Sequence, residues 1–159
     1  MNYKDIWVVL VIRTMGIDFV DEPDEWMDEW MHQVNENTDY HETGEGWGVD
    51  FNGNYIFRVN PGDSPMEEPI TNFAEVSDGA VHSVENVDPD EIEEYDYGFI
   101  YEGSYDSWKQ LIHGEIGPID GLMSGAFDVV GDMQLMLQYT DGASTLASAA
   151  NQVDTEFPY

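Results

Sequence analysis

The stretch Tyr97–Gln138, YGFIYEGSYDSWKQLIHGEIGPIDGLMSGAFDVVGDMQLMLQ, decides the fold of this chain. Its apolar segments are short, and glycines at 103, 114, 117, 121, 125 and 131 separate them. The pattern predicts a strand, a capped helix, a turn, a second short helix, a strand and a longer helix. Because none of these segments can close a core alone, the order favours an apolar binding compartment over a catalytic centre.

Local signals set the expected boundaries within this stretch. A strand is expected over 94–102, with Tyr95, Tyr97, Phe99 and Tyr101 on one face. Ser104 or Asp106 can cap the helix that follows, which ends at Gly114, and Pro118 opens a second helix that ends near Gly125. A strand is expected at 127–130, and a single helix capped by Asp132 and running to about Ala150 follows it.

The upstream half predicts one helix and four strand segments. Pro23 opens a helix to about Asn35, since Trp26, Met27, Trp30, Met31 and Val34 share one helical face. Val49–Val59 is expected to form a hairpin around Asn52-Gly53-Asn54, followed by strands at Ile70–Val76 and Ala80–Val84 joined by Ser77-Asp78-Gly79. These runs imply an antiparallel meander within one α+β domain.

The charge of the chain is extreme, with 34 acidic against 4 basic residues and a net charge of −30. The acids run through every segment, so the surface repels itself unless salt shortens the Debye length from about 8 Å to roughly 3 Å. This composition fits a cytoplasmic protein of a salt-accumulating halophile, such as a halophilic archaeon. It excludes nucleic acid as a partner, because phosphates require Lys and Arg.

The first 14 residues differ in composition from the rest. They carry a net charge of +1 and the apolar run Ile6–Ile12, which at seven residues is too short to span a bilayer. We expect no stable membrane insertion. Our hypothesis is that the mature protein begins at Met15, that residues 1–14 are a wrongly included leader, and that 15–159 form a single domain.

Several residues and their order resemble the sterol carrier protein type 2 family of lipid-binding domains, over about residues 19–150. The matching pieces are Gly103-Ser104-Tyr105-Asp106-Ser107-Trp108, Leu111-Ile112-His113-Gly114-Glu115, Pro118, Met123-Ser124-Gly125 and Gly131-Asp132-Met133. The resemblance implies an α+β fold with a five-stranded, mostly antiparallel sheet, helices packed on one side, and an apolar tunnel between the sheet and the C-terminal helices.

One position departs from the family. A basic residue commonly follows the Ser-Gly pair, whereas Ala126 stands here and Asp128 lies one strand residue further. The change removes a cationic contact for an anionic head group. It therefore disfavours fatty acids and acyl-CoA as ligands. If the source is a halophilic archaeon, we expect isoprenoid ether lipids or quinone-like molecules rather than sterols.

A tunnel needs apolar side chains that converge without filling the space, and methionine adapts to such irregular shapes. The expected lining consists of Phe99, Leu111, Ile112, Ile119, Leu122, Met123, Phe127, Val129, Met133, Met136 and Leu137.

Catalytic and metal motifs are incomplete. Glu29 and His32 form a single Glu-x-x-His unit, whereas di-iron bundles use two, and His41, His82 and His113 have no ligand spacing. Asp88-Pro-Asp90 starts like a calcium loop but lacks its glycine and its final glutamate. Ser124 lacks the Gly-x-Ser-x-Gly setting of a nucleophile. We expect no metal, no cofactor and no catalytic residues.

The interpretation is an intracellular, non-enzymatic domain that sequesters or transfers a lipid or other hydrophobic small molecule. The alternative is an interaction or regulatory module whose core is filled and whose first helix docks to a partner protein. A hydrolase that uses a carboxylate pair is a third, weaker hypothesis. A continuous apolar cavity would distinguish the first from the second.

Overall fold

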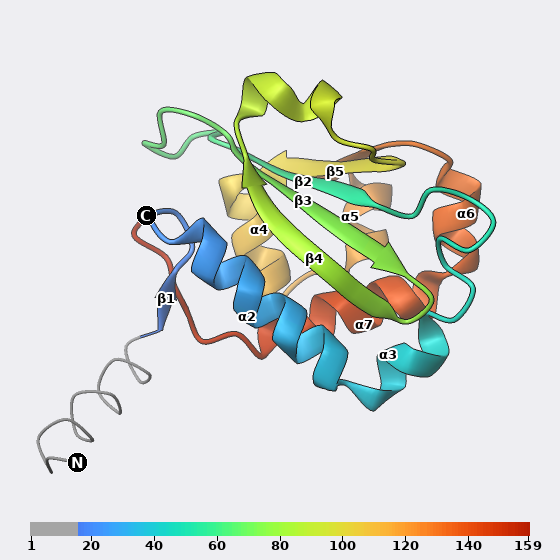
Figure 1. Cartoon of the computed structure of the whole chain (residues 1–159). Helices are drawn as coiled ribbons and strands as arrows, with labels where there is room; N and C mark the ends of the chain where they lie inside the picture. The colour runs from blue at the N-terminus through green and yellow to red at the C-terminus, as the bar shows by residue number, and fades with distance from the viewer. Residues whose placement is uncertain (1–15) are drawn as a thin grey trace, which may run out of the picture.

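The computed structural model describes residues 16–159 (Figure 1). The leader hypothesis for residues 1–14 lies outside the described residues. A five-stranded sheet in the order β4-β3-β2-β5-β6 forms the centre of the fold. Its strands are β2 (Tyr55–Asn60), β3 (Ile70–Ser77), β4 (Ala80–Val87), β5 (Phe99–Ser104) and β6 (Phe127–Val130). Three of the four pairings are antiparallel, and β2 with β5 is parallel.

Helices pack on one side of this sheet, which we call the inner face. They are α2 (Pro23–Glu36), α3 (Thr38–Thr43), α4 (Tyr105–Ile112), α5 (Pro118–Ser124), α6 (Met133–Gln138) and α7 (Thr140–Asn151). In Figure 1, α4, α5 and α7 lie behind the sheet and α2 runs along its β4 edge. The α+β class, the five strands and the one-sided helices confirm the predicted fold.

Backbone signals explain several boundaries. Pro23 occupies the start of α2 and Asp24 and Glu25 fill its first turn, where acids oppose the positive end of the helix dipole. The β3–β4 turn places Asp78 at φ 49° and Gly79 at φ 80°, as a two-residue hairpin loop with two positive φ angles requires. Asn35 then ties α2 to β4, because its side chain donates to Val81 O and accepts from Val81 N.

The predicted caps of the C-terminal half are also confirmed. Ser104 Oγ accepts a hydrogen bond from Ser107 N at the start of α4. Gly125 ends α5 at φ 84°, in the left-handed region that favours glycine. Asp132 Oδ1 accepts from the backbone N of Gln134 and of Leu135, which opens α6.

The predicted hairpin at Val49–Val59 is wrong. Only Tyr55–Asn60 is a strand, and Val49 is 59% exposed in the preceding loop. Asn54 forms tertiary hydrogen bonds instead of a hairpin turn: its side-chain oxygen accepts from Val76 N, and its backbone carbonyl accepts from Phe99 N. The predicted antiparallel meander is confirmed for the three strands β2, β3 and β4, whereas the other edge of β2 pairs in parallel with β5.

Two further boundaries differ from the expectation. Residues Pro89–Glu94 form the 3-10 helix η1, so β5 begins at Phe99 rather than at Glu94. Tyr95 and Tyr97 consequently join the cluster on the outer face of the sheet, with Ile56, Phe73 and Val87. The expected single C-terminal helix is broken at Tyr139, whose backbone (φ −111°, ψ 37°) is not helical, and α6 and α7 are separate.

The N-terminal and C-terminal ends of the described chain lie together. The short strand β1 (Ile17–Asp18) pairs in parallel with β7 (Thr155–Glu156), beside the start of α2. None of the helices in residues 16–159 has the length and apolarity needed to cross a membrane.

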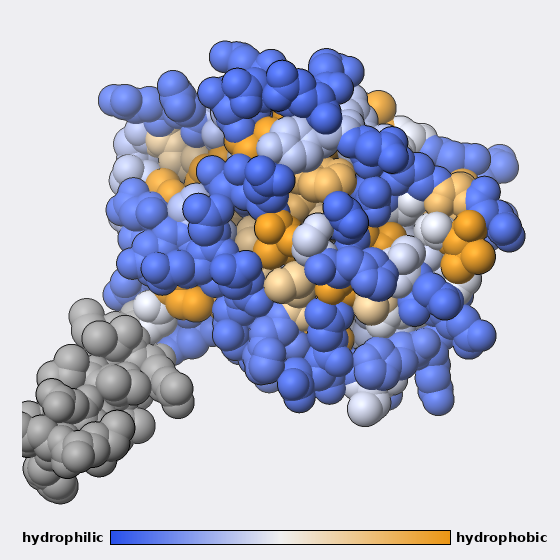
Figure 2. All heavy atoms as spheres, viewed as in Figure 1, coloured by the Kyte–Doolittle hydropathy of each residue, from blue (hydrophilic) through white to orange (hydrophobic). Residues whose placement is uncertain are grey.

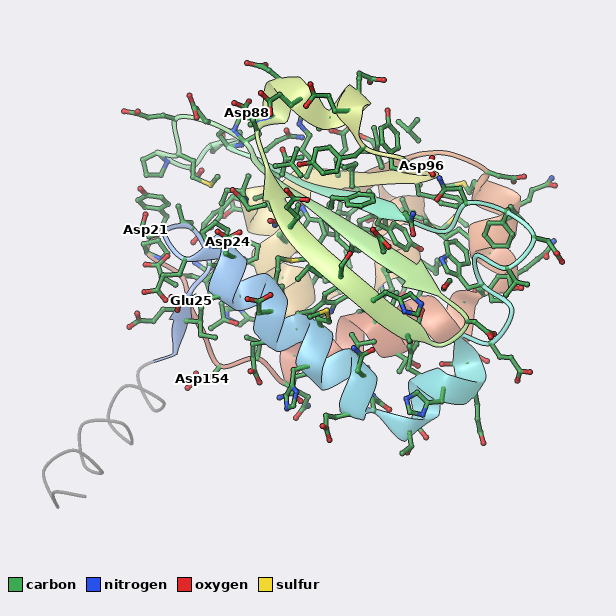
Figure 3. The ribbon with its side chains drawn as sticks, viewed as in Figure 1. Asp21, Asp24, Glu25, Asp88, Asp96 and Asp154 are labelled. Carbon is green, nitrogen blue, oxygen red and sulfur yellow. The ribbon has the colours of Figure 1, made fainter. Side chains whose placement is uncertain are left out.

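The surface is mostly hydrophilic on the face shown in Figure 2, with smaller apolar areas between polar side chains. The acids labelled in Figure 3 come from separate places: Asp21, Asp24 and Glu25 at the start of α2, Asp88 before η1, and Asp96 and Asp154 in later loops. Acidic charge is therefore spread over the fold rather than gathered in one cluster.

Candidate functional site

An apolar cavity lies between the inner face of the sheet and α2, α4 and α7. The central strand β2 contributes three side chains to its wall, α2 contributes three and α7 contributes four. The complete lining is Phe19, Trp26, Met27, Trp30, Tyr55, Phe57, Val59, Asn72, Tyr101, Trp108, Leu111, Pro118, Met136, Ala143, Leu146, Ala147 and Ala150.

The cavity is narrow. The cavity volume is about 70 Å³. One ordered water needs at least about 10–15 Å³, so the cavity holds several groups of that size. A bulkier guest must displace side chains, and the flexible Met27 and Met136 are the lining residues best suited to move.

Aromatic rings form the fixed part of the wall. Phe57 lies edge-on to Trp30 at 5.5 Å and to Trp108 at 5.9 Å between ring centroids. The indole N–H of Trp30 donates to Leu146 O at 3.1 Å, and that of Trp108 donates to Arg58 O at 2.9 Å. Trp26 Nε1 likewise donates to Thr155 Oγ1 at 2.8 Å. With their polar atoms paired to the protein, these tryptophans present only carbon surface to the cavity.

Small side chains on α7 explain why space remains opposite these rings. Ala143, Ala147 and Ala150, together with Leu146, follow a spacing of three and four residues and lie on one helical face toward the cavity. An alanine extends only one carbon beyond the backbone. The helix therefore closes the compartment without filling it.

The cavity wall carries no charged side chain among its described residues. Burial raises the pKa of Tyr55 and of Tyr101 well above the ordinary tyrosine value, so both are neutral at physiological pH. Tyr101 Oη donates to Pro118 O at 2.7 Å. Asn72, on β3, is the one amide side chain in the lining.

The residues predicted to line a tunnel fall into three groups. Leu111 and Met136 line the cavity. Phe99, Ile112, Leu122 and Phe127 are buried in the adjoining core, while Ile119 and Val129 are half-buried against it. The third group is exposed to solvent, with exposed fractions of 66% for Met123, 37% for Met133 and 37% for Leu137.

These placements have local causes. Phe127 is held in the core because two glycines, Gly103 and Gly121, leave room for its ring. The break at Tyr139 gives α6 an axis of its own, so Met136 faces the cavity while Met133 and Leu137, one turn apart from each other, face outward.

Most of the wall was not predicted from the sequence. Trp26, Met27 and Trp30 show helical spacing, but a buried helical face looks the same whether it packs on side chains or borders a void. The sequence signal that could have indicated a cavity is the spacing of Ala143, Ala147 and Ala150. Alanine side chains on one helical face are too short to fill the space between that helix and the large side chains opposite it.

The incomplete metal and catalytic motifs have ordinary contacts. Glu29 Oε1 accepts a hydrogen bond from Gln33 Nε2, and Ser124 Oγ donates to Gly121 O. Within residues 16–159, no three His, Cys, Asp or Glu side chains lie close enough together to hold a metal ion.

No protein-family model matches the sequence, and no curated protein matches it either. Solved structures do share its fold. A conserved protein of Thermus thermophilus, suggested to be a sterol carrier protein, aligns with a TM-score of 0.70 and 20% identity over 85% of this chain and 90% of its own. A sterol carrier protein 2 crystal structure aligns at 0.67 and 19%, over 81% and 95%. The sterol carrier protein domain 2 of Helicoverpa armigera aligns at 0.52 and 16%, over 84% and 91%.

Proposed function

We propose that this protein binds an apolar lipid in the cavity and sequesters or transfers it without catalysing a reaction. The observation that carries the proposal is a cavity whose wall is aromatic and aliphatic and has no charged group. The shared fold with proteins named as sterol carriers supports the same function. The ligand classes that suit such a wall are sterol-like, acyl and isoprenoid molecules.

Burial of hydrocarbon supplies the binding energy in this proposal. Each methylene transferred from water contributes about 0.8 kcal/mol, so a short alkyl segment in the cavity is enough for measurable affinity. Met27 and Met136 allow the cavity to widen around a longer chain. Affinity then follows chain length until the available space is filled.

We also propose that the protein works in the cytoplasm of a cell with a high salt concentration. Of its four basic residues, only Arg58 and Lys109 belong to the described part, against acids in nearly every segment. Concentrated salt shortens the range of their mutual repulsion and stabilises the compact state.

Native mass spectrometry of protein purified in molar salt, followed by lipid extraction, tests lipid binding. We expect a co-purifying hydrophobic molecule in the wild-type protein and its loss in Ala147→Trp, which places a large ring in the cavity. Ser148→Trp is the matched control, because Ser148 is exposed on the next position of α7. A wild-type protein that carries no guest and takes up none from added lipid would contradict the proposal.

The alternative function, a regulatory module docking through the first helix, has less support. The exposed positions of α2 include Asp24, Glu25 and Asp28, so its free face is acidic rather than apolar. A partner there would have to be basic. The lipid experiment separates the two hypotheses, since a docking module would lose nothing when Ala147→Trp fills the cavity.

A further inference from the structure

Asn72 is a polar residue in an otherwise hydrocarbon compartment. It lies on β3, its side chain points to the inner face, and it is 4% exposed. On the neighbouring strand β2, Phe57 pairs with Asn72 and lies on the same face of the sheet. Phe57 is itself part of the cavity wall. An amide at such a position is costly unless each of its polar atoms is hydrogen-bonded.

The neighbouring hydrogen bonds fix the orientation of this amide. Asn86 Nδ2 donates to the backbone carbonyl of Thr71 at 3.2 Å, which identifies it as the nitrogen. The same nitrogen donates to Asn72 Oδ1 at 3.1 Å, so this atom of Asn72 must be the oxygen. The remaining atom, Asn72 Nδ2, is a donor for which the described residues supply no acceptor. Asn72 lines the compartment, and its Nδ2 is not among the described side-chain atoms that are sealed from solvent without a partner, which are Arg58 Nε and Thr71 Oγ1.

Among residues 16–159, no cationic side chain lines this compartment to neutralise an anion. Arg58 lies on β2 between the inward residues Phe57 and Val59, so its side chain projects to the outer face. Lys109 Nζ donates to Tyr159 O at 2.6 Å, away from the cavity. A carboxylate or phosphate buried here would be desolvated without a counter-charge, which strongly disfavours its binding.

We propose that the ligand is an uncharged lipid with a hydrogen-bond-accepting oxygen, such as a ketone, quinone, ester or alcohol, and that Asn72 Nδ2 donates to this oxygen inside the cavity. The inference rests on the proposed function and adds the ligand's chemical class and its polar contact. The hydrocarbon part of the ligand packs between the aromatic wall and the alanines of α7, and the oxygen lies toward β3.

Three probes of equal chain length test this inference: 2-decanone, decanoic acid and decane. Binding to delipidated full-length protein is followed by the fluorescence of the cavity tryptophans at pH 8, where the acid is ionised. We expect Asn72→Leu to weaken the binding of 2-decanone about fivefold relative to the binding of decane, as the loss of one neutral hydrogen bond of about 1 kcal/mol gives. Decanoate should bind more weakly than both.

Asn72→Leu removes the donor and keeps the approximate shape, so the affinity for the ketone should fall while the affinity for the alkane stays unchanged. Thr71→Val is the matched control, because Thr71 is equally buried on the same strand but points to the outer face. The control should keep the wild-type ranking. Near-UV circular dichroism reports whether each variant folds, and if Asn72→Leu does not, the comparison of 2-decanone with decanoate in the wild-type protein remains decisive.

Decanoate binding as tight as that of 2-decanone would overturn the inference and leave the proposed function intact. An unchanged ratio of the ketone affinity to the alkane affinity in Asn72→Leu would overturn the role of Asn72 in the same way. If the wild-type protein bound none of the three probes, the proposed function itself would fail, and the inference with it.

Discussion

Replacing Ala147 by leucine tests directly whether the compartment under α7 is hollow. Ala147 lines the cavity near the middle of the helix. In a hollow compartment the three added carbons enter free space and bury hydrocarbon. In a filled core the same group must push its neighbours apart. The two cases predict opposite signs for the change in the free energy of unfolding.

The size of the change follows from the three added carbons. At about 0.8 kcal/mol each they contribute about 2.4 kcal/mol, from which about 0.5–1 kcal/mol is lost as side-chain rotamer entropy. The apoprotein should therefore gain about 1.5–2 kcal/mol, which for a chain of this length raises Tm by about 3–8 °C. Overpacking of a filled core would instead cost about 1–3 kcal/mol.

The assay is urea and thermal unfolding of delipidated protein at a fixed, molar salt concentration. Ser148→Leu serves as the control, since its side chain is exposed and its effect should stay within about 0.5 kcal/mol. Ala147→Leu should also weaken lipid binding, because the leucine occupies the ligand's space. A lower Tm in Ala147→Leu with an unchanged Tm in the control would refute the hollow compartment.

Three further outcomes are expected. Dialysis from molar to millimolar salt should unfold the domain, because the repulsion among its acids is no longer screened; a near-UV circular dichroism spectrum retained in dilute buffer would contradict the high-salt proposal. Burial raises the pKa values of Tyr40, Tyr55 and Tyr101 above about 10, so their contribution to stability is complete below pH 10 and falls as pH rises beyond it; unfolding midpoints measured from pH 8 to 11 should decrease only at the alkaline end. Gly103→Ala should destabilise the fold by about 1–3 kcal/mol in urea, since the new Cβ would lie 2.5 Å from the Phe127 ring.

Features that depend on neighbouring residues could be predicted from the sequence. The Asp78-Gly79 turn, the Ser104 and Asp132 caps and the left-handed Gly125 each follow from a few adjacent residues. In each case, the residue acts on backbone groups that lie within one turn of it in the sequence. These signals placed α2, α4, α5 and most of the strands, but they missed α3 and the break between α6 and α7.

Features set by distant partners could not be predicted. Asn52-Gly53-Asn54 has the composition of a hairpin turn, but Trp47 Nε1 donates to Gly53 O, and Asn54 bonds to β3 and to the start of β5. The cavity also depends on residues that are distant in the sequence. The apolar spacing of Trp26 and Trp30 specifies a buried face, and only the residues facing it across the fold determine whether that face meets atoms or free space.

The parallel pairing of β2 with β5 also bears on how the chain reaches its native state. Tyr55 lies beside Phe99, so the centre of the sheet joins segments roughly forty residues apart, whereas β3 and β4 join through a two-residue turn. Closing a long loop is entropically unfavourable and slows folding relative to local hairpin formation. The β3–β4 hairpin should therefore assemble early. The apolar cavity, whose floor spans β3, β2 and β5, can exist only after the slower, long-range step is complete.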